Sequence, residues 1–179
     1  MAVGSRVVKE RWSRMKAKRR FPKDVVTAIR DGRILGIRAG TKPHRIIGIW
    51  AVVVENRVFV RSWSLKQRSW YRAFLEEPRG IIVVDGRETS TPAGLPRRGP
   101  RIPVRAVFTR SERLKTAVDR AYGQKYNTPG SLHFVRGFAR KKRRDTTTEL
   151  VPGEQTAGGR SRRQWAVNSK DEGGRMKDD

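Results

Sequence analysis

The sequence of 179 residues contains no cysteine and only two histidines, His44 and His133. Disulfide bonds and thiolate metal sites are therefore excluded, and two histidines are a poor basis for an imidazole metal centre, so we expect no metal. The longest apolar run, Ile46–Val54, is far shorter than the roughly 20 residues of a membrane helix. No apolar segment follows the basic N-terminus, so no signal peptide is expected. We therefore expect a cytoplasmic protein without a membrane span.

Motifs of familiar catalytic sites are missing as well. The sequence has no GxGxxG, Walker or HExxH pattern, and without a nucleophile elbow it offers no Ser-His-Asp set. The adjacent carboxylates Glu76 and Glu77 fall at the end of a predicted helix, where we expect them to be solvated. The sequence therefore shows no catalytic acid, base or nucleophile.

Acidic residues are scarce beside basic ones. The chain has 42 Lys and Arg against 17 Asp and Glu, a net charge of +25. About half of this excess, +13, falls within residues 24–138, so the termini alone do not explain it. Such a charge attracts nucleic acid, phosphorylated cofactors or anionic membranes. The alternative is an arginine-rich composition that uses arginine at ordinary solvated positions.

The residues that are present alternate between short apolar segments and turns. The predicted strands are 34–38, 45–54, 57–63, 81–84 and 102–109. Three helices are predicted: one that begins at Pro22, one over 69–77 and one over 111–126. We expect the strand 45–54 to be central because it is apolar on both faces, and Glu55-Asn56 to form a tight turn. Hairpin-linked strands predict an α+β fold with a mainly antiparallel, barrel-like sheet and a few peripheral helices.

Three segments organise the chain. We expect a basic N-terminal arm over 1–20, one domain over 21–151 and a disordered tail over 152–179. The proline- and glycine-rich stretch 87–101 has no periodicity and predicts a long loop inside the domain.

Two polar clusters flank the apolar hairpin. Gly40–Arg45 and Arg61–Ser64 combine cationic and hydroxyl donors that suit phosphate. Because hairpin strands are antiparallel, we expect the clusters to meet at one rim, with flat tryptophan faces nearby. The predicted cofactor-binding residues are Lys42, His44, Arg45, Arg61, Ser62, Trp63, Ser64 and Trp70. The alternative is that the arginines are edge charges and the tryptophans belong to the core.

These segments resemble a bacterial domain family of unknown function that is grouped with the FMN-binding split β-barrels. The likeness covers about residues 22–151 and rests on the runs IRAGTKPHRIIGIWAVVVENRVFVRSWS, WYRAFLEEPRG, IPVRAV, DRAYGQKYNTPGS and TTTELVP. The chain is more weakly similar to the deazaflavin-dependent nitroreductases. Gly40, Lys42 and Arg45 fall at the position of their G-R-K-S-G-x-x-R turn, and Trp70 at the position of their helix tryptophan. Their Asn-Leu helix end is replaced by Ala73-Phe74, and residues 89–101 resemble an insertion.

The resemblance implies a flavin-reductase-like split barrel of six strands, a homodimer, and FMN or a deazaflavin as cofactor. It also implies a small-molecule oxidoreductase, in which the flavin supplies the chemistry and the fold positions it. Two alternatives stay open. One is an unspecific nucleic-acid-binding module that uses the basic segments 6–20 and 140–144, and the other is a cofactor-free ligand-binding barrel.

Overall fold

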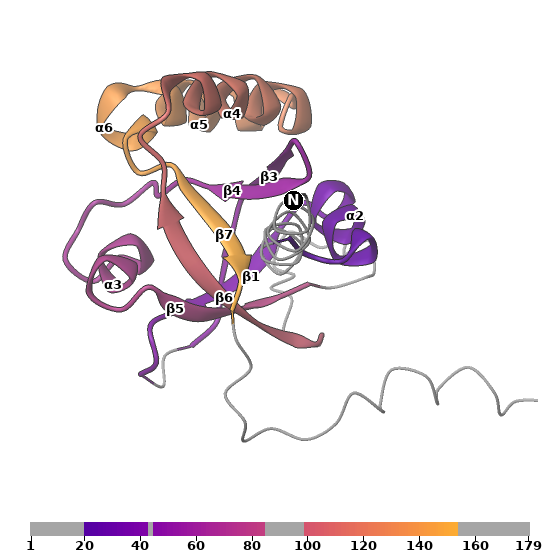
Figure 1. Ribbon diagram of the computed structural model, residues 1–179. Helices are drawn as coiled ribbons and strands as arrows, with labels where there is room; N and C mark the ends of the chain where they lie inside the picture. Colours follow the sequence, from indigo (N-terminus) through magenta and orange to yellow (C-terminus); the bar gives the residue numbers. More distant parts are fainter. Residues whose placement is uncertain (1–19, 43–44, 85–98, 154–179) are drawn as a thin grey trace, which may run out of the picture.

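A computed structural model describes residues 20–42, 45–84 and 99–153 of the chain (Figure 1). The described helices are α2 (Lys23–Asp31), α3 (Trp70–Glu76), α4 (Glu112–Lys125), α5 (Pro129–Ala139) and α6 (Lys141–Arg144). The strands are β1 (Leu35–Ala39), β2 (Ile47–Ile49), β3 (Ala51–Val54), β4 (Arg57–Val60), β5 (Arg79–Val83), β6 (Arg101–Phe108) and β7 (Thr148–Pro152). None of these helices is long and apolar enough to cross a membrane.

The strands form one antiparallel sheet that curls into a nearly closed barrel. Their order is β2-β1-β5-β6-β7-β4-β3, and each neighbouring pair is antiparallel. The first and last strands of this order, β2 and β3, follow each other in the chain with only Trp50 between them. A single bent segment therefore joins the two ends of the sheet. The predicted α+β barrel is confirmed.

The expectation of one central strand over 45–54 is wrong. The segment breaks at Trp50, and its halves pair with different partners: β2 with β1, and β3 with β4. Strands of a small barrel must tilt and bend to close it, and this bend leaves each half with one neighbour among the described strands. The segment is apolar on both faces because β3 contributes to two cores, Ala51 and Val53 to one and Val52 and Val54 to the other.

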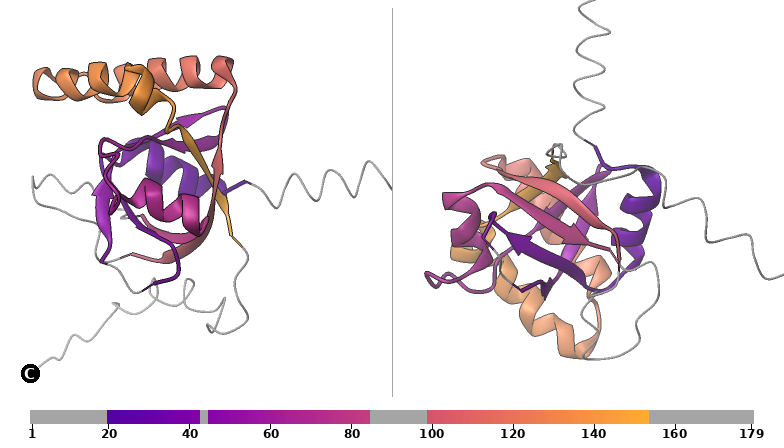
Figure 2. Two further views of the ribbon diagram at one scale, coloured as in Figure 1. Left: turned by 90° about the vertical axis from the view of Figure 1, so that its left-hand side faces the viewer. Right: turned by 90° about the horizontal axis from the view of Figure 1, so that it is seen from below.

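The first core fills the barrel, and the second lies between the barrel and the helical layer. Helices α2 and α3 lie on opposite sides of the barrel (Figure 1) and supply Val26, Ile29 and Phe74 to the first core. Helices α4 to α6 form a layer across one side of the barrel (Figure 2). Val118 and Tyr122 of α4 belong to the second core, with Phe59 of β4. The side chains of β4 thus alternate between the two cores, with Val58 and Val60 in the first and Phe59 in the second.

Turn and cap residues set the ends of several elements as expected. Glu55 and Asn56 have φ angles of 53° and 56°, the left-handed conformation that tight hairpins between twisted strands require. Ser69 and Ser111 precede α3 and α4, and the hydroxyl of each accepts a hydrogen bond from the backbone N–H three residues later, at 3.3 Å in both helices. The predicted helices 69–77 and 111–126 are confirmed.

Three of the described elements, α5, α6 and β7, were not predicted. The helix predicted over 111–126 ends there, but Pro129 then begins a second helix, α5. Proline suits this first helical position because the N–H that it lacks would have no partner within the helix. Strand β7 pairs with both β4 and β6 and joins the two halves of the sheet. Arg101 and Pro152, expected in the long loop and in the tail, belong to β6 and β7. The remainder of the predicted arm, loop and tail lies outside the described residues, except for Arg20, Gly99, Pro100 and Gly153.

Candidate functional site

A pocket of about 600 Å³ opens where β2 departs from the β3–β4 hairpin. The hairpin pairs up to Ala51 and Val60, and beyond this point β2 turns toward β1 while residues 61–69 form a loop. The space between the diverging segments is the pocket, and α5 covers its third side. Its lining residues are Ile47, Gly48, Ile49, Trp50, Arg61, Ser62, Trp63, Ser64, Lys66, Arg68, Ser69, Trp70, Phe134 and Phe138.

Packed aromatic rings form the walls of the pocket. Trp50 stacks on Tyr126 with ring centroids 4.1 Å apart and planes 4° from parallel. Phe134 lies edge-on to Trp50 at 5.7 Å and to Trp63 at 4.9 Å. Phe134 is nevertheless 41% exposed, so it lies at the edge of the pocket. Neighbouring rings hold these walls in place, which favours a flat aromatic ligand.

The loop 61–69 is held by hydrogen bonds within it and by one to Thr146. The Ser62 N–H donates to Thr146 Oγ1 at 2.9 Å, and the Ser62 hydroxyl donates to the Ser64 carbonyl at 2.6 Å. The Lys66 N–H donates to the Ser64 hydroxyl at 3.3 Å. Lys66 and Arg68 are exposed side chains of this loop that line the pocket. The loop therefore presents two cations at the pocket from an ordered backbone.

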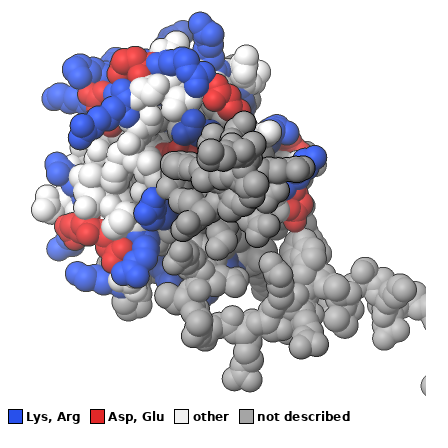
Figure 3. Space-filling model, viewed as in Figure 1, with Lys and Arg blue, Asp and Glu red and all other residues white. Residues whose placement is uncertain are grey.

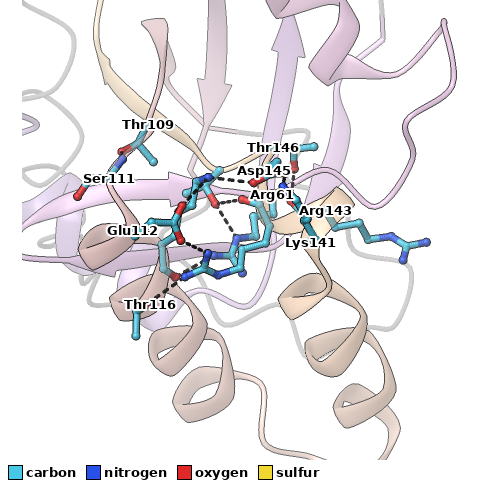
Figure 4. Close-up of polar contacts among 12 residues, drawn as sticks. Arg61, Thr109, Ser111, Glu112, Thr116, Lys141, Arg143, Asp145 and Thr146 are labelled. Atoms are coloured by element: carbon cyan, nitrogen blue, oxygen red, sulfur yellow. Dashed lines mark hydrogen bonds and ion pairs between the residues drawn. The ribbon is translucent and has the colours of Figure 1, made fainter.

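Arg61 is buried, and its guanidinium is bonded within the fold (Figure 4). Its side chain is 0% exposed and pairs with Asp119 of α4. Nε donates to Thr147 Oγ1 at 2.8 Å, and the two terminal nitrogens donate to the carbonyls of Phe138 at 3.1 Å and Lys115 at 2.9 Å. Arg61 thus ties the end of β4 to the helical layer and to β7. These bonds leave it unsuited to the phosphate contact that the sequence predicted.

The basic run 140–144 is partly paired with carboxylates. Arg144 bonds to Glu112 and to Asp119, the latter at 2.9 Å. Lys141 and Lys115 bond to Asp145 at 2.8 and 2.9 Å, and they lower the pKa of that carboxyl to about 2. Figure 3 shows basic and acidic side chains intermixed over this layer, at the top of the view. Part of the charge that suggested nucleic-acid binding is therefore neutralised within the fold.

The structure brings together five of the eight predicted site residues: Arg61, Ser62, Trp63, Ser64 and Trp70. Lys42 and Arg45 are exposed and do not line the pocket, because the bend at Trp50 turns their segment toward β1. His44 lies outside the described residues.

Among the aromatic and cationic residues that line the pocket, the sequence analysis did not predict five: Trp50, Lys66, Arg68, Phe134 and Phe138. The two phenylalanines were missed with α5 itself. Lys66 and Arg68 had a visible signal, since they continue the mixed cationic and aromatic pattern of residues 61–70.

The sequence model of the family DUF2255, described as an uncharacterized protein conserved in bacteria, matches residues 24–150. The chain belongs to DUF2255. The predicted resemblance to a bacterial family of unknown function is thus confirmed, whereas its grouping with FMN-binding barrels and nitroreductases stays a prediction. No curated protein matches the chain. Among solved structures, the conserved hypothetical protein Rv2991 from Mycobacterium tuberculosis is similar, with 13% identity and a TM-score of 0.45. The match covers 78% of this chain and 84% of that one.

In this DUF2255 chain, two side chains of α4 and that of Tyr126, its C-cap residue, hold the bend at Trp50. The Tyr122 hydroxyl donates to the Trp50 carbonyl at 3.2 Å. The Ala51 N–H donates to the Tyr126 hydroxyl at 3.1 Å, and Lys125 Nζ donates to the Ala51 carbonyl at 2.8 Å. These bonds satisfy backbone groups that the strand ladder leaves at the break.

Burial shifts the pKa of each of these three groups in the direction that favours its neutral form. It raises the pKa of both tyrosine hydroxyls, Tyr122 and Tyr126, and lowers the pKa of Lys125 to about 8. Because all three donate to or accept from the backbone around Trp50, we assign them to the support of the pocket wall rather than to chemistry.

Proposed function

We propose that this DUF2255 protein binds FMN or a deazaflavin in the pocket beside Trp50, Trp63 and Trp70. One observation carries the proposal: aromatic walls and two exposed cations line a single pocket, and no carboxylate is among its described lining residues. This combination suits a flat ring that bears an anionic group.

The size and the donors of the pocket support a phosphorylated aromatic ligand. Pockets of about 300–1,000 Å³ are typical of small-molecule sites. The ring would stack between the tryptophan walls, while Lys66 and Arg68 would bind the phosphate, one as a point charge and the other as a planar fork. Arg45, two residues before Ile47 of the lining, remains a candidate for an outer contact.

The role of the chain in an oxidoreductase reaction would be to bind and orient. A bound flavin or deazaflavin accepts and donates hydride itself. Neither His, Tyr, Asp nor Glu is found among the described lining residues. The side chains would therefore fix the ring between Trp50 and Trp63 and exclude water from it, and no protein acid or base is assigned.

An absorbance spectrum of the full chain purified from its native host, followed by titration with FMN and with a deazaflavin, tests the proposal. We expect micromolar binding, and we expect Lys66→Gln with Arg68→Gln to weaken it by about tenfold per lost charge-assisted hydrogen bond. Arg113→Gln is the matched control, because Arg113 is an exposed arginine paired with Glu55 on the hairpin turn.

Two results would end the proposal. One is the absence of binding by either cofactor at saturating concentration, which would favour the alternative hypothesis of a cofactor-free ligand-binding barrel. The other is equal loss in the control variant, which would mean that general charge rather than the pocket attracts the ligand.

A further inference from the structure

Arg143 of α6 directs its charge onto an aromatic ring. Its guanidinium carbon lies 4.0 Å from the ring centroid of Trp63, and its Nε donates to the Trp63 carbonyl at 3.0 Å. The neighbouring Lys141 and Arg144 both pair with carboxylates, whereas no acidic side chain of the described residues lies within ion-pair distance of Arg143. Figure 4 shows Arg143 extending away from the ion-pair network.

This charge lies behind a wall of the pocket. Trp63 lines the pocket and Arg143 does not, so the guanidinium covers the indole from outside. The indole has little freedom to move away. A Cβ at Gly137 would approach within 2.4 Å of it, and Phe134 and Phe138 meet it edge-on at 4.9 and 5.6 Å.

A cation on one face of an indole changes which ligand charge binds best against the opposite face, on the pocket side. The free face of an aromatic ring is negative and repels anions, and a guanidinium stacked on it offsets that potential. A ligand ring against the pocket side of Trp63 would lie within about 10 Å of Arg143, the screening length at 0.1 M salt. Arg143 therefore attracts negative charge on the ligand ring itself. This attraction adds to that of Lys66 and Arg68 for an anionic group outside the ring.

We propose that the pocket selects an aromatic ring that itself carries negative charge, and that Arg143 is the residue that sets this selectivity. Arg143 acts through Trp63 and does not touch the ligand. The inference rests on the proposed function in taking this pocket as the site of a flat ring. For a flavin or deazaflavin it means that the reduced, anionic ring is bound more tightly than the oxidised one.

The test compares 2-naphthoate with 2-naphthamide, which share a ring and nearly a shape but differ in charge. Their dissociation constants are measured by tryptophan fluorescence for the full chain, Arg143→Gln, Arg143→Lys and Lys142→Gln. We expect the full chain to prefer naphthoate, and Arg143→Gln to reduce this preference by about five- to thirtyfold, as a unit charge at such a distance predicts. Arg143→Lys should keep most of the preference, and Lys142→Gln, an equal loss of charge from the same helix, should change it by less than about twofold.

An unchanged preference in a folded Arg143→Gln variant would overturn the inference, and so would naphthoate that binds no more tightly than naphthamide or does not bind. Near-UV circular dichroism checks that the variant is folded. The two proposals fail separately. A preference that depends on Arg143, without binding of FMN or deazaflavin, rejects only the proposed cofactor. Cofactor binding with a preference that ignores Arg143 rejects only the charge selectivity.

Discussion

At the scale of single residues, Lys125 is a partly buried cation whose protonation state changes near pH 8. Its ammonium bonds to the Ile29 carbonyl at 2.7 Å and the Ala51 carbonyl at 2.8 Å, and so joins the end of α2 to the bend of the barrel. Burial lowers its pKa to about 8, and Asp31 raises it only in part. Neutral lysine can still donate to both carbonyls, so the fold keeps these bonds when the proton leaves.

The stability of the protein should therefore rise between pH 8 and about 9.5. In this window the unfolded chain, with a lysine pKa near 10.4, binds more protons at this site than the folded chain, and the free energy of unfolding increases with pH. We expect a gain of about 1–2 kcal/mol, measured by urea denaturation. Above pH 10 the buried tyrosines reverse the trend, because their raised pKa values penalise ionisation in the fold.

Lys125→Met should remove this rise, whereas Lys23→Met, a change at an exposed lysine of α2, should keep it. A wild-type profile that is flat or falls between pH 8 and 9.5 would contradict the assignment.

At the scale of elements, the contact of α5 with the loop 61–69 decides the shape of the pocket. The helix approaches closely at Gly137, where the ring of Trp63 occupies the space of a side chain. Phe134 and Phe138, on the same helix, form part of the lining. Movement of α5 would therefore displace three aromatic groups of the pocket together.

Gly137→Ala should disturb this contact and lower stability by about 1–3 kcal/mol, the usual range for overpacking. A new Cβ would fall 2.4 and 2.5 Å from atoms of the Trp63 ring, so the ring or the helix must shift. Gly123→Ala on α4 is the matched control. Nothing lies within 4 Å of its new Cβ, and alanine should stabilise the helix by up to about 1 kcal/mol.

Thermal unfolding and tryptophan fluorescence measure both effects. Equal stability of the two alanine variants, with unchanged fluorescence, would show that α5 does not press on Trp63 as described.

Local sequence patterns predicted most helices and strands, but not the bend at which β2 separates from the β3–β4 hairpin. The helices 69–77 and 111–126 and the turn Glu55-Asn56 depend on neighbouring residues, so local sequence patterns predicted them. The bend at Trp50 depends on closure of the whole barrel, which no local pattern encodes. The predicted rim assumed a straight hairpin, and for the same reason only its Arg61–Ser64 part lines the pocket, whereas Lys42 and Arg45 do not. Arg61 was misjudged because its partner Asp119 is distant in sequence.

At the scale of the whole molecule, the positive charge opposes compactness. The net charge is +25, and the carboxylates of the helical layer are already shared between several cations, such as Asp119 between Arg61 and Arg144. The remaining cations repel one another, which destabilises a compact state at low ionic strength.

Added salt should therefore stabilise this protein. We expect the melting temperature to rise by about 2–6 °C between 20 and 500 mM NaCl, a change of roughly 1 kcal/mol for a domain of this size. A melting temperature that falls with NaCl would mean that the ion pairs of α4 and α6 outweigh the repulsion.

The position of Trp50 has a consequence for altering this protein. Trp50 lies at the bend that lets the sheet close and also forms a wall of the pocket. A substitution of Trp50 would therefore change both folding and ligand binding. The side chains of Lys66 and Arg68 are exposed on a loop held by hydrogen bonds, and they belong to neither hydrophobic core. Engineering of new ligand preferences should therefore begin at these two positions and leave Trp50 unchanged.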